Sequence, residues 1–298
     1  MRAACCLSLT LLIPFIAGCP RPEQRYVTVS RGRILACNDE RLIVGRVEHD
    51  GDYRTADPRI ALSCDGLLAM ASAKDLAVYD LKRGGRLAVV ENVNPWAVAW
   101  SPDGKQLVAA LFEPQEPLKL TVFEPDLTLR RTLSTSMAPG YNDITLSWGA
   151  EPPLIVVSDD RTWFSNGVGD CEVIDPVTAE ITEWPDLIDV HFVGANRVVA
   201  SDPREPDRPA LYQITDDGRL ERIRYLRGGR IVGAGPNYVL TIAAALRPFT
   251  LLTVEGHLAL FDGEGRFLGR YPAFENLRGS FALDVCDAVD TSHAEVAE

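Results

Sequence analysis

The sequence has few of the residues from which most catalytic and metal sites are built. Its four histidines lie far apart, and no two of them have the spacing of metal ligands. The metalloprotease pattern HExxH, the hydrolase pattern GxSxG and the zinc or redox pattern CxxC do not occur. These absences argue against the enzyme classes that carry such motifs. His191, within the apolar stretch DVHFV, is interpreted as a packed residue rather than a ligand.

A concentration of positive charge is also lacking. The formal net charge is −12 at pH 7, from 30 Lys and Arg against 42 Asp and Glu, whereas a nucleic-acid surface needs basic residues clustered on one face. The nearest approach to a basic cluster is an alternating set around a glycine pair, made of Arg222, Arg224, Arg227 and Arg230. This alternation predicts a solvated hairpin face. We expect no nucleic-acid partner.

No apolar run reaches the roughly 20 residues that a bilayer requires. The longest, from Ala3 to Ala17, follows one positive charge at Arg2 and precedes Gly18 and Cys19, as in a secretory signal. The ending IAGC resembles the bacterial lipobox. That resemblance implies cleavage between Gly18 and Cys19, with the cysteine becoming the acylated first residue. The alternative is an ordinary cleaved signal with a cysteine there by chance.

The resemblance to lipoproteins also implies a location. Two or more acyl chains, such as palmitate, hold a protein firmly to a membrane whereas one does so only marginally. Pro20, and not Asp, follows Cys19, which by the enterobacterial sorting habit favours the outer membrane. We therefore expect an exported, lipid-anchored protein of the cell envelope, with a signal peptide over 1–18 and a short tether over 19–25.

Helical periodicity is nearly absent, and short apolar runs are broken roughly every 8 to 12 residues by Gly, Pro, Asp or Asn. The chain is therefore predicted to be all-β. Two kinds of strand pair alternate along it. One is an apolar-x-apolar-acid strand, a turn and a second strand, as in AVYDLKRGGRL, TVFEPDLTLR, EVIDPVTAEI, YQITDDGRLE, LALFDGEGRFL and, more weakly, VGRVEHDGDY. The other is a strand, a tight turn and a buried strand, as in IALSCDGLLAMASA, AVAWSPDGKQLVAALF, ITLSWGAEPPLIVVSD, VHFVGANRVVASD and IVGAGPNYVLTIAA.

Four-stranded units repeating about every 40 residues are typical of a β-propeller. The stretch WSPDGKQLVAA resembles the motif of TolB-like and YVTN/WD-like bacterial propellers, and SCDGLL resembles the same motif with a cysteine in the proline place. The resemblance implies a fold and not an activity. A TolB role is not implied, because the chain has no room for the extra amino-terminal domain of TolB.

We expect a single propeller domain over 26–290 and an acidic tail over 291–298. Six blades are favoured, over about 26–58, 59–94, 95–141, 142–187, 188–229 and 230–272, and seven is the alternative. Residues 277–289 are left to close the ring beside the first blade. That closure favours a Cys37–Cys286 disulfide, with Cys37–Cys64 or four buried thiols as alternatives.

The stretch WSPDGKQL brings together the residue types of a catalytic loop, since a serine, an aspartate and a lysine lie close in it. Pro102 and Gly104, however, are the residues that a tight turn requires. The copy at SCDG keeps Asp65 and Gly66 while it loses the proline and the lysine, as a turn would and a catalytic set would not. We interpret it as a turn on the face opposite the long loops.

The long loops of a propeller join second to third strands, on the face that the blade-to-blade connections share. Here they are FEPQEP, SDDRTWFSNGVGD, SDPREPDRP and ALRPF, which mix aromatic residues with arginine as protein-binding surfaces do. The candidate partner-binding residues are Asp160, Arg161, Trp163, Phe164, Arg204, Arg208, Arg247 and Phe249.

The resulting hypothesis is a non-catalytic scaffold that binds another envelope protein or a surface ligand and needs no cofactor. The alternative is a calcium-dependent hydrolase similar to the propeller lactonases. Oxygen donors in the blade-connecting loops suit a hard cation, although they are also ordinary turn residues. The candidate calcium ligands are Asp57, Asn94, Asp143, Asp189 and Asn276.

The lipid anchor gives a direct prediction. Cys19→Ala removes the only acylation point that the lipobox resemblance offers, so the protein should move from the membrane fraction to the soluble fraction. Cell fractionation followed by immunoblotting measures this. Retention of the variant in membranes would contradict the anchor.

Overall fold

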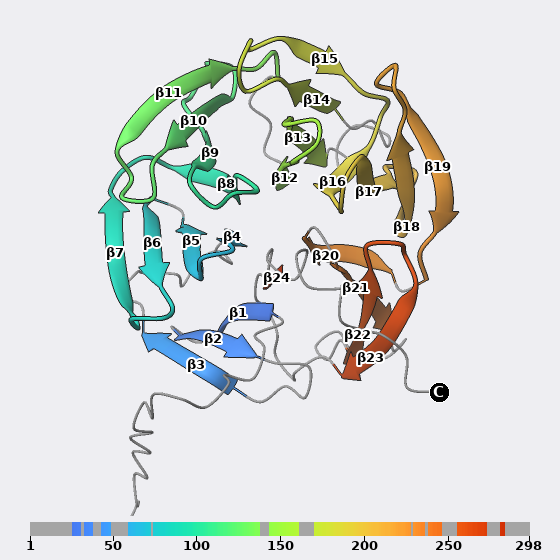
Figure 1. The fold of residues 1–298 in the computed structure, drawn as a ribbon, viewed down its shortest axis with the longest axis horizontal. Helices are drawn as coiled ribbons and strands as arrows, with labels where there is room; N and C mark the ends of the chain where they lie inside the picture. The colour runs from blue at the N-terminus through green and yellow to red at the C-terminus, as the bar shows by residue number, and fades with distance from the viewer. Residues whose placement is uncertain are drawn as a thin grey trace, which may run out of the picture.

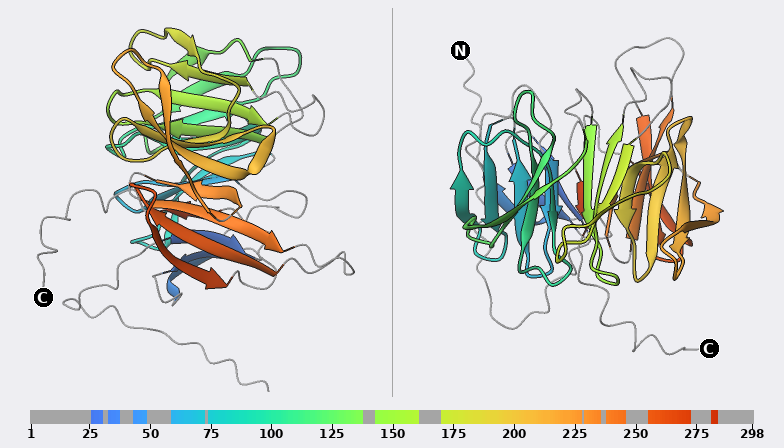
Figure 2. Two further views of the ribbon diagram at one scale, coloured as in Figure 1. Left: turned by 90° about the vertical axis from the view of Figure 1, so that its right-hand side faces the viewer. Right: turned by 90° about the horizontal axis from the view of Figure 1, so that it is seen from above.

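The computed structural model describes residues 26–30, 33–37, 43–48, 59–72, 74–137, 143–160, 170–227, 229–235, 238–245, 255–272 and 281–283. These residues form six four-stranded antiparallel sheets arranged around a common axis (Figure 1). Seen from its edge, the ring has strands that run between its two flat faces (Figure 2). The chain is thus an all-β propeller of four-stranded blades, as the repeats predict.

Five blades are built from consecutive strands, each ordered from the ring axis outward. Their strands are β4 (Arg59–Leu62), β5 (Leu67–Ala71), β6 (Leu76–Asp80) and β7 (Gly85–Val90); β8 (Pro95–Trp100), β9 (Leu107–Leu111), β10 (Lys119–Phe123) and β11 (Leu129–Ser134); β12 (Asp143–Trp148), β13 (Ile155–Asp160), β14 (Asp170–Ile174) and β15 (Ile181–Glu183); β16 (Ile188–Phe192), β17 (Arg197–Asp202), β18 (Glu205–Ile214) and β19 (Leu220–Tyr225); and β20 (Arg230–Ala234), β21 (Tyr238–Ala245), β22 (Glu255–Asp262) and β23 (Phe267–Pro272).

The remaining sheet draws on both ends of the chain. It has the order β24-β1-β2-β3, with β1 (Tyr26–Ser30), β2 (Arg33–Cys37), β3 (Ile43–Glu48) and β24 (Phe281–Leu283). Tyr26 pairs with Leu283 and Thr28 with Phe281. The expected count of six or seven repeating blades is thereby corrected to five blades of consecutive strands and one composite sheet. The reason is that a closed ring takes one strand of its last sheet from the other end of the chain.

Closure also corrects one repeat assignment. VGRVEHDGDY was expected to be the outer hairpin of the first blade, but residues 43–48 form the single outermost strand β3. The strand before it in the sheet is β2, which pairs with both β1 and β3. Because β24 supplies the innermost strand, each amino-terminal strand lies one place further out than the repeat pattern predicts.

Each blade buries both of its faces against its neighbours. In β9 the side chains of Val108 and Ala110 pack toward the β12–β15 blade, whereas Leu107 and Ala109 pack toward the β4–β7 blade. All four are fully buried. Strands buried on two faces are apolar throughout instead of alternating, which explains the run LVAALF. The hydrophobic core is therefore a set of layers between blades.

The surroundings of two cysteines, Cys64 and Cys171, are described by the structure. Cys171 is buried between the β12–β15 and β16–β19 blades, and burial raises the pKa of its thiol. The Sγ atom of Cys64 lies 4.0 Å from the carbonyl oxygen of Pro102 in the neighbouring blade. The side chain of Cys37 and the whole of Cys286 lie outside the described residues, so the Cys37–Cys286 disulfide stays a prediction.

Gly149 gives a test of the packing between blades. A Cβ atom added there would lie 2.6 Å from the Phe192 ring of the next blade, which is closer than van der Waals contact allows. Gly149→Ala should therefore destabilise the fold by about 1–3 kcal/mol, measured by thermal or denaturant unfolding. Gly85→Ala is the matched control, because nothing lies within 4 Å of its added Cβ. Equal effects of the two substitutions would contradict this packing.

Candidate functional site

The connections between second and third strands and those between blades share one side of the ring, which we call the loop face. The carbonyl oxygen of Lys74, in a second-to-third connection, accepts hydrogen bonds from Val93 N at 2.9 Å and Asn94 N at 3.4 Å, both between blades. Phe112 N in turn donates to Asn94 O at 3.2 Å. The predicted grouping of these connections is confirmed at these positions.

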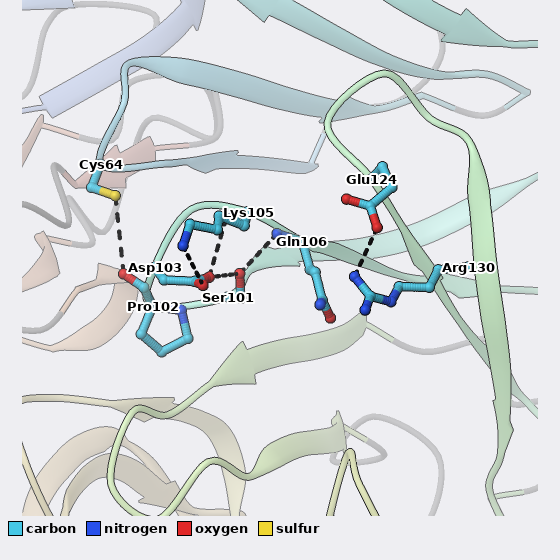
Figure 3. A network of polar contacts seen from close by, with 8 residues as sticks. All are labelled: Cys64, Ser101, Pro102, Asp103, Lys105, Gln106, Glu124 and Arg130. Atoms are coloured by element: carbon cyan, nitrogen blue, oxygen red, sulfur yellow. Dashed lines mark hydrogen bonds and ion pairs between the residues drawn. The ribbon is translucent and has the colours of Figure 1, made fainter.

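The opposite side, which we call the turn face, carries the stretch Ser101–Gln106 (Figure 3). Ser101 Oγ donates to Asp103 Oδ1 at 2.6 Å and accepts a hydrogen bond from Gln106 N at 2.9 Å. Asp103 Oδ1 also accepts from Lys105 N at 3.1 Å, and Gly104 has a φ of 68°. The side-chain hydrogen bonds of Ser101 and Asp103 to described residues thus all lie within the turn, as the sequence predicts.

Most of the predicted partner-binding residues cannot be placed. Arg161, Trp163, Phe164, Arg247 and Phe249 lie outside the described residues. Asp160 ends β13 opposite Asp143, but its side chain is not described. Arg204 and Arg208 are described, and both are exposed.

The loop expected over SDPREPDRP is mostly strand. β17 extends to Asp202 and β18 begins at Glu205, so only Pro203 and Arg204 connect them. The loop was predicted from its prolines, which usually interrupt strands. Pro206 and Pro209 instead lie on a part of β18 that extends beyond the end of its outer neighbour β19. Proline is tolerated at such an edge. The hairpin therefore projects Arg204 at its tip and Arg208 along its side.

Two arginines of this blade stack on one aromatic ring. The guanidinium carbon of Arg208 lies 4.0 Å from the centre of the Tyr225 ring, and that of Arg222 lies 4.3 Å from it. Partial burial raises the pKa of the Tyr212 phenol, and the positive charge of Arg222 acts against that rise. We call Arg208, Tyr212, Arg222 and Tyr225 the arginine–tyrosine cluster.

A β-bulge makes this cluster possible. Residues three apart on a regular strand point to opposite faces, so Arg222 and Tyr225 would not meet. In β19, however, Arg222 pairs with Tyr212 and Arg224 with the adjacent Leu211, which leaves Ile223 as an extra residue. The extra residue brings Arg222 and Tyr225 to the same face. The sequence predicted only a solvated hairpin here, since RIRY gives no sign of a bulge.

Only two of the five candidate calcium ligands, Asn94 and Asp189, have described side chains, so the calcium site stays a prediction. Asn94 and Asp189 adopt left-handed φ angles of 46° and 52°, which Asn and Asp tolerate better than most residues. Asp57 and Asn276 lie outside the described residues, as does the side chain of Asp143. Among the described residues, no three His, Cys, Asp or Glu side chains lie close enough to hold a metal ion.

His191 lies on the innermost strand β16. Its surroundings withhold water from the imidazolium, which lowers its pKa to about 4. The ring is therefore neutral at physiological pH, and the side chain is half-buried. As for the membrane, no helix within the described ranges is long and apolar enough to span one.

No family model and no curated protein matches the sequence. Solved structures do match. TolB from Acinetobacter baumannii is 11% identical, covers 89% of this chain and 68% of its own, and has a TM-score of 0.61. A protein assigned to TolB from Agrobacterium tumefaciens is 15% identical, with 87% and 91% covered and a TM-score of 0.57.

A protein of unknown function from Bacteroides caccae is 11% identical, with 88% and 99% covered and a TM-score of 0.61. At these identities the likeness concerns the fold alone. It confirms the resemblance to TolB-like propellers that WSPDGKQLVAA indicates.

The Ser101–Asp103 turn should contribute to stability in a pH-dependent way. Asp103→Ala removes two hydrogen bonds and should cost about 1 kcal/mol at neutral pH, seen as a lower Tm. The Ser101 hydroxyl, and next the Lys105 backbone and charge, lower the pKa of Asp103 against the opposing effect of partial burial. The contribution is therefore present at neutral pH and is lost as the pH falls through that lowered pKa.

Asp65→Ala is the matched control, since no described residue donates a hydrogen bond to its carboxylate and the residue occupies the same place in the neighbouring turn. We expect little change in Tm from it. A Tm unchanged by Asp103→Ala, or lowered equally by both substitutions, would contradict this account of the turn.

Proposed function

We propose that this protein is a non-catalytic binding scaffold of the cell envelope, which holds another envelope protein or a surface ligand on its loop face. In this proposal Cys19 carries acyl chains that tether the ring to the outer membrane, and the composite sheet β24-β1-β2-β3 serves as a sixth blade. The function requires no cofactor.

The observation that carries the proposal is the Pro203–Arg204 hairpin of the loop face with the cluster beside it. Arg204 and Arg208 are exposed on the β17–β18 hairpin, and Tyr225 on the neighbouring strand β19 retains 38% of its accessible surface. Arginine and tyrosine are enriched among the residues that contribute most to protein binding. Support from the ring also limits the conformational entropy lost on association.

The similarity to TolB and other propellers supports a scaffold at the level of the fold. The calcium-dependent hydrolase stays the alternative, because the side chains of Asp57, Asp143 and Asn276 lie outside the described residues. A binding role is therefore the function that the described residues favour.

Site-specific cross-linking in intact envelopes tests the proposal. A photo-reactive residue in place of Arg204 should give a discrete covalent adduct with a partner, whereas one in place of Val177 should not. Val177 is the matched control, since it is 78% exposed on the third-to-fourth hairpin of the β12–β15 blade, on the turn face. Adducts at Val177 alone, or at neither position, would contradict binding through the loop face.

Thermal unfolding of the purified protein can be measured with EDTA and with calcium. An unchanged Tm is expected of the scaffold. A Tm lowered by several degrees with EDTA and restored by calcium would favour the hydrolase instead.

A further inference from the structure

We propose that the arginine–tyrosine cluster is a carboxylate-binding site, and that the partner presents an acidic, extended protein segment to it. This inference rests on the proposed binding role and names the chemistry of the partner. Its elements are Arg208 and Arg222 stacked on Tyr225, together with the neighbouring exposed arginines of the same blade.

The first argument is charge. Residues 197–230 contain eight arginines and six Asp or Glu, a small positive excess in a chain whose net charge is −12. Among the described residues, no carboxylate lies within ion-pair distance of Arg222, Arg224, Arg204 or Arg227. Arg208 pairs with Glu205 at 3.1 Å through one nitrogen, and its other nitrogens make no ion pair with a described residue. A group of cations left without counter-charges is complementary to an acidic partner.

Arginines on the outer hairpins of two other blades are paired with carboxylates. On the outer strand β11, Arg130 binds Glu124 at 2.8 Å, and in the outer hairpin of the β20–β23 blade, Arg266 binds Asp262 at 2.6 Å. Those arginines are satisfied within their own hairpins. Arg222 instead has two tyrosines as neighbours, so its charge is held in place without being neutralised.

The second argument is geometry. A guanidinium stacked on an aromatic ring keeps its N–H donors in its own plane, where a carboxylate can accept two of them. Stacking also orders the side chain before a ligand arrives, which reduces the entropy lost on binding. Tyr225 does this for Arg208 and Arg222 together, at 4.0 and 4.3 Å. Two guanidinium groups held over one tyrosine ring suit successive carboxylates of a peptide better than a single small anion.

The third argument is access. β19 is the outermost strand of its sheet, and its residues from Glu221 to Tyr225 are all exposed. Ile223 retains 44% of its accessible surface beside the arginines. On the next blade Phe267 and Leu268 retain 54% and 50%, and the turn at Gly265 approaches the Arg224 side chain. An extended segment could therefore place apolar side chains along the rim while its carboxylates meet the arginines.

The test measures binding of a fluorescein-labelled peptide of alternating glutamate and serine to the whole protein by fluorescence anisotropy. The peptide with glutamine in place of glutamate is the comparison ligand. We expect the acidic peptide to bind, more weakly as salt increases, and Arg222→Gln to reduce its affinity about tenfold. Arg130→Gln, which removes an ion-paired arginine from the corresponding strand, should leave the affinity unchanged.

Tyr225→Leu separates binding from folding. It keeps apolar bulk at an exposed position but removes the ring, so affinity should fall several-fold while the Tm stays near that of the wild type. Arg222→Lys keeps the charge and should recover only part of the affinity, because an ammonium cannot form the planar two-point contact. Full recovery with lysine would overturn the stacked-fork geometry.

Anionic lipid vesicles are the competing ligand. Binding of the soluble Cys19→Ala protein to phosphatidylglycerol vesicles in an Arg222-dependent manner, without binding to the peptide, would overturn the proposal in favour of a membrane surface. Peptide binding that does not depend on Arg222 would also overturn it. If the cross-link at Arg204 forms in either case, the scaffold function stands and only the carboxylate site fails.

Discussion

The structure depends on each blade having two apolar faces that must both be covered. Val108 and Leu107 are neighbours in one strand, yet they pack into two different interblade layers. A linear stack of such blades would leave an apolar face uncovered at each end. Bending the stack into a closed ring removes both ends, and the pairing of β24 with β1 joins the two parts of the chain where it closes. The composite sheet therefore follows from the same constraint that makes β9 apolar throughout.

In a closed ring of antiparallel blades, the two kinds of connection lie on opposite faces. Tight turns gather on the turn face, where Trp100 Nε1 donates to Ala61 O of the neighbouring blade at 3.0 Å and Gly104 approaches Cys64. These contacts join the WSPDGKQL turn to the neighbouring blade. On the loop face the described hairpins differ in length, since two residues connect β17 to β18 and Phe112 to Leu118 connect β9 to β10.

The β16–β19 blade shows how such variation produces a distinct surface. Its second and third strands extend beyond the fourth, and one bulged residue in β19 redirects the side chains that follow. These two departures from a regular blade place Arg208 and Arg222 over the aromatic ring of Tyr225. In other blades, Arg130 and Arg266 of the outer hairpins are paired with carboxylates of their own hairpins. The ring thus supplies rigidity, and local irregularity supplies the binding chemistry that we propose.

The sequence by itself determined the all-β class, the four-stranded repeat, both kinds of strand pair and the role of the Ser101–Gln106 turn. These are local properties, set by apolar alternation and by the backbone preferences of proline and glycine. The sequence also predicted that residues 277–289 close the ring beside the first blade, and the pairing of β24 with β1 confirms it. Only the tertiary structure decided the place of each strand in the composite sheet, the strand through Pro206 and the cluster on Tyr225. Each of these depends on pairing between residues distant in sequence or on a bulge that changes which face a side chain takes, and neither leaves a periodic signal in the chain.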